Sequence, residues 1–296
     1  MRIGVLGNDG SWYVEQLQHA GQERSHTVIP LRFPEICVRI LGGRTRLTIG
    51  ETDISTLDAL IVRTMPPGSL EQVVLRMDFL SAAEQLGVRI VNSPRAIECA
   101  VDKYLTTQKL AVAGLPVPDT IVCEDSDAAM QAFETLGRDV VVKPVFGAEG
   151  RGILRVDHPE MALRTFRTLE RLNTTLYVQR FLKGPLEDIR ILLLDGKPVA
   201  SMKRRPADGD FRANAAQNGI TTPWAPTDEE LHLAIRAADV SGCVFSGIDL
   251  MYNEHAEPMI IEVNAVPGWR RIQQTCCVDV PQTLLHWLEA TSQHAR

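Results

Sequence analysis

The sequence predicts an α/β fold with α+β subdomains, and two patterns in its 296 residues support this. In the first third, short apolar runs that end in turn residues alternate with segments whose apolar residues recur at helical intervals. Such strand–helix–strand alternation favours a parallel sheet with helices on its faces. Later strands are joined by short polar turns, which favours antiparallel pairing.

Residues 1–98 are predicted to form the parallel-sheet unit. Its predicted strands are Arg2–Leu6, Leu57–Val62 and Val88–Val91, and its predicted helices are Trp12–Ala20 and Leu70–Leu86. The first strand ends in the turn sequence Gly-Asn-Asp-Gly, and the second helix stops at a glycine, as helices commonly do.

A single helix is predicted from Pro94 through Lys103 to Ala113, because apolar residues keep helical spacing along it. The next segment, Leu115-Pro-Val-Pro118, cannot continue the helix, since proline lacks an N–H donor and restricts the residue before it. We therefore predict a domain boundary between Asn92 and the second of these prolines.

The remaining elements divide into a small subdomain over 99–184 and a C-terminal subdomain over 185–296. The predicted strands are Asp139–Lys143, Leu176–Phe181, Ile189–Leu194, Pro198–Arg204, Phe245–Tyr252 and Met259–Val263, and the predicted helices are Pro159–Leu172, Thr227–Val240 and Pro281–Ala290. Glu230 follows Thr227 by three residues, which is the order of a capping box. Asp195-Gly196 lies where a hairpin turn is expected between two of the strands.

Composition excludes several classes of function. The formal net charge of −6 disfavours a general nucleic-acid binder, which would carry a basic surface. None of the six cysteines forms a CxxC pair, and no Cys/His spacing suits zinc, so the thiols are expected to be reduced and unbridged. With no signal-peptide pattern and no apolar run of about 18 residues, we expect a cytoplasmic protein without a membrane partner.

Three polar residues in the last two predicted strands form a candidate metal site. Asp249 lies in an otherwise apolar strand, and Glu262 and Asn264 lie two apart in the next strand, so their side chains share a face. If the strands pair, the three side chains converge into an oxygen-only set that suits Mg²⁺ or Mn²⁺. The alternative is that the acidic residues lie separately on a polar surface.

Lys143 ends a buried strand and precedes a glycine-rich stretch that contains Gly147, Gly150 and Gly152. Backbone N–H groups in such a loop can approach phosphate oxygens closely. The order of a Walker loop, GxxxxGK[ST], is absent, and no dinucleotide fingerprint is complete. A solvated strand end followed by a flexible loop stays the alternative.

Cations cluster in the following segment at Arg190, Lys203, Arg204, Arg205 and Arg212. Strand alternation sends the first and third residues of Lys-Arg-Arg to one face and the second to the other. Arginine suits carboxylate or phosphate because its donors form a planar fork. A solvated loop of mixed charge is the alternative. No Ser-His-Asp order supports a nucleophilic hydrolase.

Taken in order, these features resemble the ATP-grasp superfamily, and specifically its RimK-type alpha-L-glutamate ligases. The resemblance covers nearly the whole chain. The residues that carry it are Asp102-Lys103, Leu115–Pro118, Val142-Lys-Pro144, Val178-Gln-Arg-Phe181, Asp188-Ile-Arg190, Arg204-Arg205, Gly209–Asn214, Gly247-Ile-Asp249 and Glu262–Gly268. It implies an ATP-grasp fold behind an N-terminal parallel-sheet domain.

The resemblance also implies roles for individual residues. ATP would be bound by Lys103, Lys143, Gly147, Gly150, Gly152, Gln179, Arg180, Phe181, Asp188, Arg212 and Asn214. Within that set, the lysines contact phosphates, the segment around Phe181 lines the adenine pocket through its backbone, and Asp188 meets the ribose. The glycine loop closes as a lid. The metal would be held by Asp249, Glu262 and Asn264, and the acylphosphate by Arg190, Arg204 and Arg212.

The implied reaction is ATP-dependent amide formation through an acylphosphate, with L-glutamate added to a carboxylate on a cofactor or on a protein or peptide tail. The implied partners are ATP, the amino acid and the acceptor, and a homo-oligomer is expected. One alternative is a peptide or glutathione-type ligase that uses another amino acid. A second alternative is a catalytically inactive nucleotide-binding regulatory protein.

Two departures from the family pattern bear on the substrate. Arg180 stands where many relatives carry an acidic residue, so any adenine contact there is expected through the main chain. The run Val62-Arg-Thr-Met-Pro-Pro-Gly68 is most similar to relatives associated with tetrahydromethanopterin metabolism. A solvated strand end is the alternative for Arg63.

Overall fold

The computed structural model describes residues 1–147, 152–206 and 219–292. Contacts group the chain into two compact units. Unit 1 comprises Met1–Ile97, Gly242–Phe245 and Ala265–Arg296, and unit 2 comprises Glu98–Ser241 and Ser246–Asn264. The predicted third subdomain is therefore shared, because its last segment groups with unit 1. No helix in the described ranges is long and apolar enough to cross a membrane.

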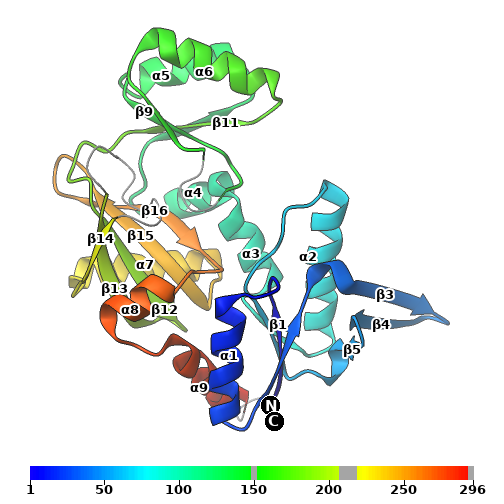
Figure 1. Cartoon of the computed structure of the whole chain (residues 1–296). Helices are drawn as coiled ribbons and strands as arrows, with labels where there is room; N and C mark the ends of the chain where they lie inside the picture. Colours follow the sequence, from blue (N-terminus) through cyan, green and yellow to red (C-terminus); the bar gives the residue numbers. More distant parts are fainter. Residues whose placement is uncertain (148–151, 207–218, 293–296) are drawn as a thin grey trace. The chain divides into compact units, whose positions relative to one another are not determined.

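Unit 1 contains the predicted parallel sheet. Its strand order is β2-β1-β6-β7, with β1 at Arg2–Leu6, β2 at Thr27–Leu31, β6 at Ala59–Val62 and β7 at Arg89–Val91. The pairs β1–β2, β1–β6 and β6–β7 are all parallel. Helices α1 (Trp12–Glu23) and α2 (Leu70–Gln85) connect the strands, as the alternation predicted (Figure 1).

A second, three-stranded sheet in unit 1 was not predicted. It comprises β3 (Ile36–Leu41), β4 (Arg44–Ile49) and β5 (Thr52–Asp53), with one-turn 3-10 helices at Phe33–Glu35 and Ile54–Thr56. All six residues of β3 pair with β4 around a Gly-Gly turn in which both glycines have positive φ. Arginines interrupt the apolar alternation of these strands, and this obscured the strand pattern.

The C-terminal segment belongs to unit 1 because of specific contacts. Helices α8 (Arg270–Cys276) and α9 (Val280–Ser292) follow the last strand, and Arg24, the residue that caps the C-terminus of α1, donates to Glu289 of α9 at 2.9 Å. The buried Asn92 side chain donates to the carbonyl oxygen of Ala265 and accepts from the amide of Phe245. One side chain thus joins three distant segments of the sequence.

The first sheet of unit 2 is antiparallel, in the order β10-β9-β11-β8. Its strands are β8 (Thr120–Cys123), β9 (Val140–Lys143), β10 (Leu154–Val156) and β11 (Leu176–Arg180). Helices α5 (Ser126–Thr135) and α6 (Pro159–Arg171) lie side by side over it, and Phe133 and Phe166 are fully buried in the core between helices and sheet (Figure 1).

The second sheet of unit 2 has the order β14-β13-β12-β15-β16. Its strands are β12 (Asp188–Leu194), β13 (Lys197–Arg205), β14 (Ile220–Pro223), β15 (Phe245–Tyr252) and β16 (Pro258–Asn264), and helix α7 spans Asp228–Ser241. The predicted hairpin between β12 and β13 is confirmed. The capping box is confirmed too, since the amide of Glu230 donates to Thr227 Oγ1 and the Glu230 carboxylate accepts from the amide of Thr227.

The single helix predicted through Lys103 is wrong. Helix α3 (Pro94–Val101) ends before Asp102, and a separate helix α4 (Lys103–Val112) follows. Asp102 has extended backbone angles, and its carboxylate accepts from the amide of Leu105 at 2.9 Å, which makes it the N-cap of α4. The break places Lys103 at the first position of a helix.

Replacing Gly184 by alanine is expected to lower the free energy of unfolding by about 3 kcal/mol. Gly184 lies against β15, and a Cβ there would stand 2.1 Å from the carbonyl oxygen of Tyr252 and 2.7 Å from that of Asn253. Gly137→Ala measures backbone strain without a clash, because Gly137 has a φ of +90°, which an L side chain rarely adopts, and nothing lies within 4 Å of a new Cβ. Urea denaturation should show the larger loss for Gly184, and equal losses would contradict the close approach.

Candidate functional site

Antiparallel strands β15 and β16 bring the predicted metal-site residues together. Asp249 is directly opposite Glu262, and Gly247 is opposite Asn264, so the polar side chains share one face. Asn264 Nδ2 donates to the carbonyl oxygen of Gly247 at 3.3 Å. Asp249 is only 2% exposed, so the alternative of a separate surface carboxylate is wrong for this residue.

Two arginines from neighbouring strands hold Asp249. Arg190 of β12 pairs with both carboxylate oxygens, with Nη2 2.7 Å from Oδ2, and Arg204 of β13 places its Nη2 2.9 Å from Oδ1. Burial alone would raise the pKa of Asp249, but the charges of Arg190 and Arg204 outweigh it and hold this pKa below its ordinary value. The carboxylate therefore stays ionised in a buried position.

Asp188 completes this network. It lies opposite Arg204 in the β12–β13 pair, is 3% exposed, and accepts from Arg204 Nη2 at 2.8 Å. Burial raises the pKa of Asp188 to about 6, against the opposing charge of Arg204. The ribose contact predicted for Asp188 stays a prediction, and the structure places its carboxylate against an arginine.

The two faces of β13 carry different cations, as the alternation predicted. Lys203 and Arg205 both pair with Glu187, the former with Nζ 3.1 Å from Oε2, whereas Arg204 turns to the opposite face. The solvated-loop alternative is therefore wrong for Arg204 and also for Arg190, which is 9% exposed. Position 212, the other arginine predicted to hold the acylphosphate, lies outside the described residues, and so does Asn214.

The predicted phosphate lysines lie close to the acidic pair. Lys103 Nζ is 3.3 Å from Glu262 Oε1 and donates to the carbonyl oxygen of Gly147 at 2.7 Å. Lys143 Nζ donates to Gln179 Oε1 at 2.7 Å. Burial lowers the pKa of Lys143 to about 8, with Glu262 opposing the shift and the nearby charge of Lys103 adding to it. The site thus concentrates cations around its carboxylates.

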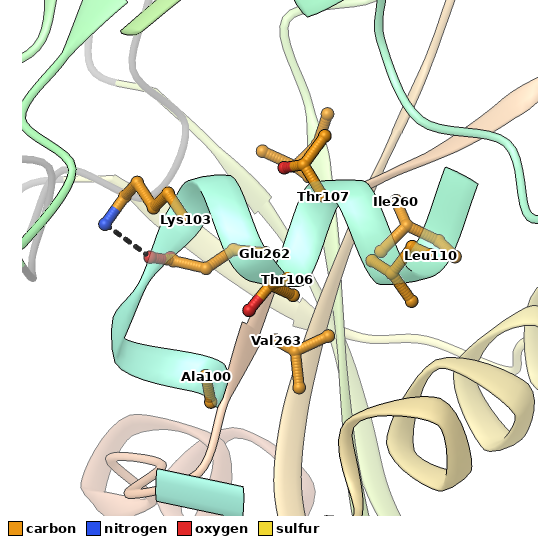
Figure 2. A pocket seen from close by; sticks show the side chains of 9 residues that line it. Ala100, Lys103, Thr106, Thr107, Leu110, Ile260, Glu262 and Val263 are labelled. Atoms are coloured by element: carbon orange, nitrogen blue, oxygen red, sulfur yellow. Dashed lines mark ion pairs between the residues drawn. The ribbon is translucent and has the colours of Figure 1, made fainter. Parts of the chain in front are cut away.

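A small pocket adjoins the Lys103–Glu262 ion pair. Figure 2 shows this pair at one end of the pocket and the apolar side chains of Leu110 and Ile260 at the other. The lining comes from α3, α4 and β16, with Thr106 and Thr107 supplying hydroxyl groups. The polar end of the pocket therefore continues the charged site.

Gln179, which accepts from Lys143, was predicted for the ATP site, but sequence reasoning missed the side chains that hold Gln179 in place. Gln179 Nε2 donates to Thr120 Oγ1 at 2.9 Å and to the hydroxyl oxygen of Tyr177 at 3.1 Å, and that hydroxyl lies 2.8 Å from Thr107 Oγ1. These bonds fix the amide so that its oxygen accepts from Lys143. Period-two alternation along β11 places Tyr177 and Gln179 on one face and could have revealed the pair.

In the segment predicted to bind adenine, two backbone amides already donate hydrogen bonds to other parts of the chain. The amide of Arg180 donates to the carbonyl oxygen of Asp119 at 2.9 Å, and that of Phe181 donates to the carbonyl oxygen of Asp139 at 3.0 Å. The Arg180 side chain pairs with the Asp119 carboxylate at 2.9 Å. Main-chain recognition of adenine here stays a prediction, and it would use carbonyl oxygens.

The glycine-rich loop is described at its two ends only. Gly147 accepts from Lys103, and Gly152 has a φ of +75°, which an L side chain rarely adopts. Gly150 lies outside the described residues. The lid role predicted for this loop stays a prediction.

The donor set fits a divalent cation that is shared with phosphate. In the described ranges, no cluster of three or more His, Cys, Asp or Glu residues is arranged to hold a metal. Asp249, Glu262 and Asn264 instead offer two carboxylates and one amide oxygen on one face. Mg²⁺ is commonly bound by one or two carboxylates, with substrate phosphates and water completing its shell. The cations around the carboxylates suit those phosphates.

Known proteins resemble the chain in sequence and in fold. A model of the RimK-like ATP-grasp domain matches residues 100–288. A Methanosarcina acetivorans protein named "Tetrahydromethanopterin:alpha-L-glutamate ligase" is 31% identical, with 97% of this chain and 98% of that protein covered. A Maridesulfovibrio salexigens protein named "Probable alpha-L-glutamate ligase" is 29% identical, with 99% of this chain and 97% of that protein covered. The solved structure of the ATP-grasp ligase PsnB, in complex with a minimal precursor, is similar in fold, with a TM-score of 0.78 and 22% identity. The match covers 97% of this chain and 98% of that chain.

Proposed function

Because the chain belongs to the RimK-like ATP-grasp family and is an ATP-dependent amino-acid ligase, we propose that it adds L-glutamate to the carboxylate of a cofactor or peptide acceptor. The observation that carries this proposal is the shared face on which Lys103, Arg190 and Arg204 surround the carboxylates of Asp249 and Glu262. A face with both signs of charge suits a nucleotide that arrives with a divalent cation. The full-length relative from Methanosarcina supports glutamate as the amino acid.

The reaction proceeds in two displacements. An acceptor carboxylate oxygen bonds to the γ-phosphorus of ATP while the bond to ADP breaks, which gives an acylphosphate. The glutamate amine then attacks the acyl carbon, loses a proton, and phosphate leaves. Lys103 and Lys143 bind the transferring phosphate groups. The Nη1 nitrogens of Arg190 and Arg204 take no part in the ion pairs with Asp249 and Asp188, and they bind the acylphosphate.

A divalent cation belongs to the same proposal. Asp249, Glu262 and Asn264 would hold Mg²⁺, or Mn²⁺ in its place, and the ion would neutralise charge on the phosphates. Arg212 and Asn214 are proposed to act beside the phosphates, Asp188 at the ribose, and the glycine loop as the cover that excludes water. A homo-oligomer in the cytoplasm completes the proposal, and the location is consistent with six cysteines that form no disulfide in the described residues.

The proposal is tested by incubating the purified protein with MgATP, single amino acids and a panel of acceptors. Acceptors should include a carboxylate-bearing pterin and glutamate-ended peptides. We expect phosphate release only when L-glutamate and an acceptor are both present, and mass spectrometry should show the acceptor heavier by one glutamyl residue. Turnover with a different amino acid would support the alternative ligase. ATP binding without release for any pair would support the regulatory protein.

ATP binding is expected to weaken above about pH 8. Lys143 has a lowered pKa of about 8, so its positive charge is present below that pH and is lost as the pH rises through it. The Kd for MgATP should stay constant below pH 8 and rise by up to about tenfold per pH unit above it. Calorimetry from about pH 6.5 to about pH 9.5, a range on both sides of the Lys143 pKa, measures the Kd for MgATP without turnover.

The control is Lys143→Met, which lacks the titrating amine. It should bind MgATP more weakly at neutral pH and should lack the rise above pH 8. Identical pH curves for the variant and the wild type would remove Lys143 from the phosphate site.

A further inference from the structure

Arg63 follows strand β6 of unit 1 and is buried between two aromatic rings. Its guanidinium carbon lies 4.0 Å from the ring centroid of Trp269 and 4.8 Å from that of Tyr13. Its Nη2 donates to the carbonyl oxygen of Pro267 at 2.7 Å. Only 5% of the residue is exposed, so the solvated strand end considered from the sequence is wrong.

This buried cation has no anionic partner. In the described ranges, no acidic side chain pairs with Arg63, and its Nε is buried without a hydrogen-bond partner. The Nε1 of the adjacent Trp269 is also buried and without a partner there. The desolvation that burial imposes lowers the pKa of Arg63 to about 9. Buried charges in proteins are ordinarily paired, as Arg190 and Arg204 are in unit 2.

The surroundings of Arg63 add positive potential. Tyr13 lies in the first turn of α1, a helix of 12 residues, and Ser11 at the N-cap makes no side-chain capping bond. Helix N-termini carry a partial positive charge and unpaired N–H donors. Asp9, in the loop before this helix, pairs with Arg32 at 2.7 Å. Unpaired donors and positive charge therefore meet on this part of unit 1.

We propose that Arg63, together with Trp269 and Tyr13, binds a carboxylate of one of the two substrates. The proposal rests on the ligase function above and deepens it. A carboxylate can accept from guanidinium Nε and from the indole Nε1, and the aromatic faces exclude water from the ion pair. The incoming amino acid and the acceptor both carry carboxylates. One guanidinium with one indole donor matches the single charge of a carboxylate better than a phosphate dianion.

Arg76 provides a matched control within the same unit. It is also a buried arginine, 6% exposed, and it also donates to a proline carbonyl, that of Pro66 at 2.5 Å. Its guanidinium carbon lies 5.7 Å from the Phe33 ring centroid. Unlike Arg63, it has no buried donor without a partner in the part of the chain that is described.

The first experiment measures binding without turnover. L-glutamate and the dicarboxylate glutarate are titrated into the full chain by calorimetry, and the same is done for each acceptor that supports ligation. Arg63→Met and Arg63→Lys should each raise the Kd of one carboxylate ligand at least tenfold, while Arg76→Lys should change it less than twofold. Circular dichroism melting establishes that the variants fold, and the lysine variant keeps the charge if the methionine variant does not fold.

The second experiment uses kinetics to identify the carboxylate. If Arg63 holds the amino acid, Arg63→Lys raises the KM for glutamate at least tenfold and leaves the KM for ATP and for the acceptor unchanged. If it holds the acceptor, the acceptor KM rises instead. Unchanged Kd and KM for every carboxylate ligand in folded Arg63 variants would overturn the inference. Carboxylate binding that depends on Arg63, without any ligation, would instead overturn the proposed function alone.

Discussion

Replacing Glu262 by glutamine is expected to lower the rate of ATP-dependent ligation by about a thousandfold or more, which corresponds to about 4 kcal/mol of transition-state stabilisation. Glutamine keeps the shape of the side chain and removes the charge that faces Lys103 at 3.3 Å. With that charge gone, the divalent cation loses one of its two proposed carboxylates. The rate is measured as phosphate release at saturating substrates.

The fold should survive this change, because the Glu262 side chain is 18% exposed and makes one ion pair in the described residues. Its melting temperature is expected to stay within a few degrees of the wild type. Glu187→Gln is the matched control, since Glu187 is a half-buried carboxylate that pairs with Lys203 and Arg205 on the opposite face. Wild-type turnover in Glu262→Gln would refute the metal assignment, and an equal loss in both variants would indicate a general structural effect.

Replacing Asp249 by alanine is expected to abolish ligation and also to lower the free energy of unfolding by about 3–5 kcal/mol. The variant leaves Arg190 buried without its carboxylate, whereas Arg204 keeps Asp188. The loss should be largest at neutral pH. The lowered pKa of Asp249 means that its stabilising charge is present above its ordinary value of 3.8 and is lost as the pH falls through the folded-state pKa.

A second substitution separates stability from chemistry. Adding Arg190→Met to Asp249→Ala removes the unpaired charge and should recover at least about half of the lost stability in urea denaturation, without restoring ligation. If the double variant is no more stable than Asp249→Ala alone, the loss does not come from a buried, uncompensated Arg190.

The strand pattern was sufficient to predict that Asp249 and Glu262 lie in adjacent, pairing strands. Their position opposite one another also depends on a register shift between Asp249 and Leu250, which the pattern did not reveal. The two faces of β13 followed from the same alternation. The ion pairs of Asp249 with Arg190 and Arg204 could not be predicted, because they depend on the order in which β13, β12 and β15 are arranged in the sheet.

Other features depended on contacts between distant residues. Arg63 looks like a solvated strand end in its own segment, and its burial results from Trp269, which lies 206 positions later in the sequence. The break at Asp102 was missed because apolar spacing continues across it, while the decisive event is a local hydrogen bond to the amide of Leu105. Periodicity reports burial along a helix and does not report such a cap.

The hydrogen bonds that the Asn92 side chain makes with Phe245 and Ala265 have a consequence for biosynthesis. Every residue of unit 2 leaves the ribosome before unit 1 has all of its sequence, because unit 1 still lacks the segment that forms α8 and α9. Domains generally fold as units in the order of their synthesis. Here unit 2 can therefore fold during translation, while the parallel-sheet unit waits for a segment synthesised more than 160 residues after its last strand.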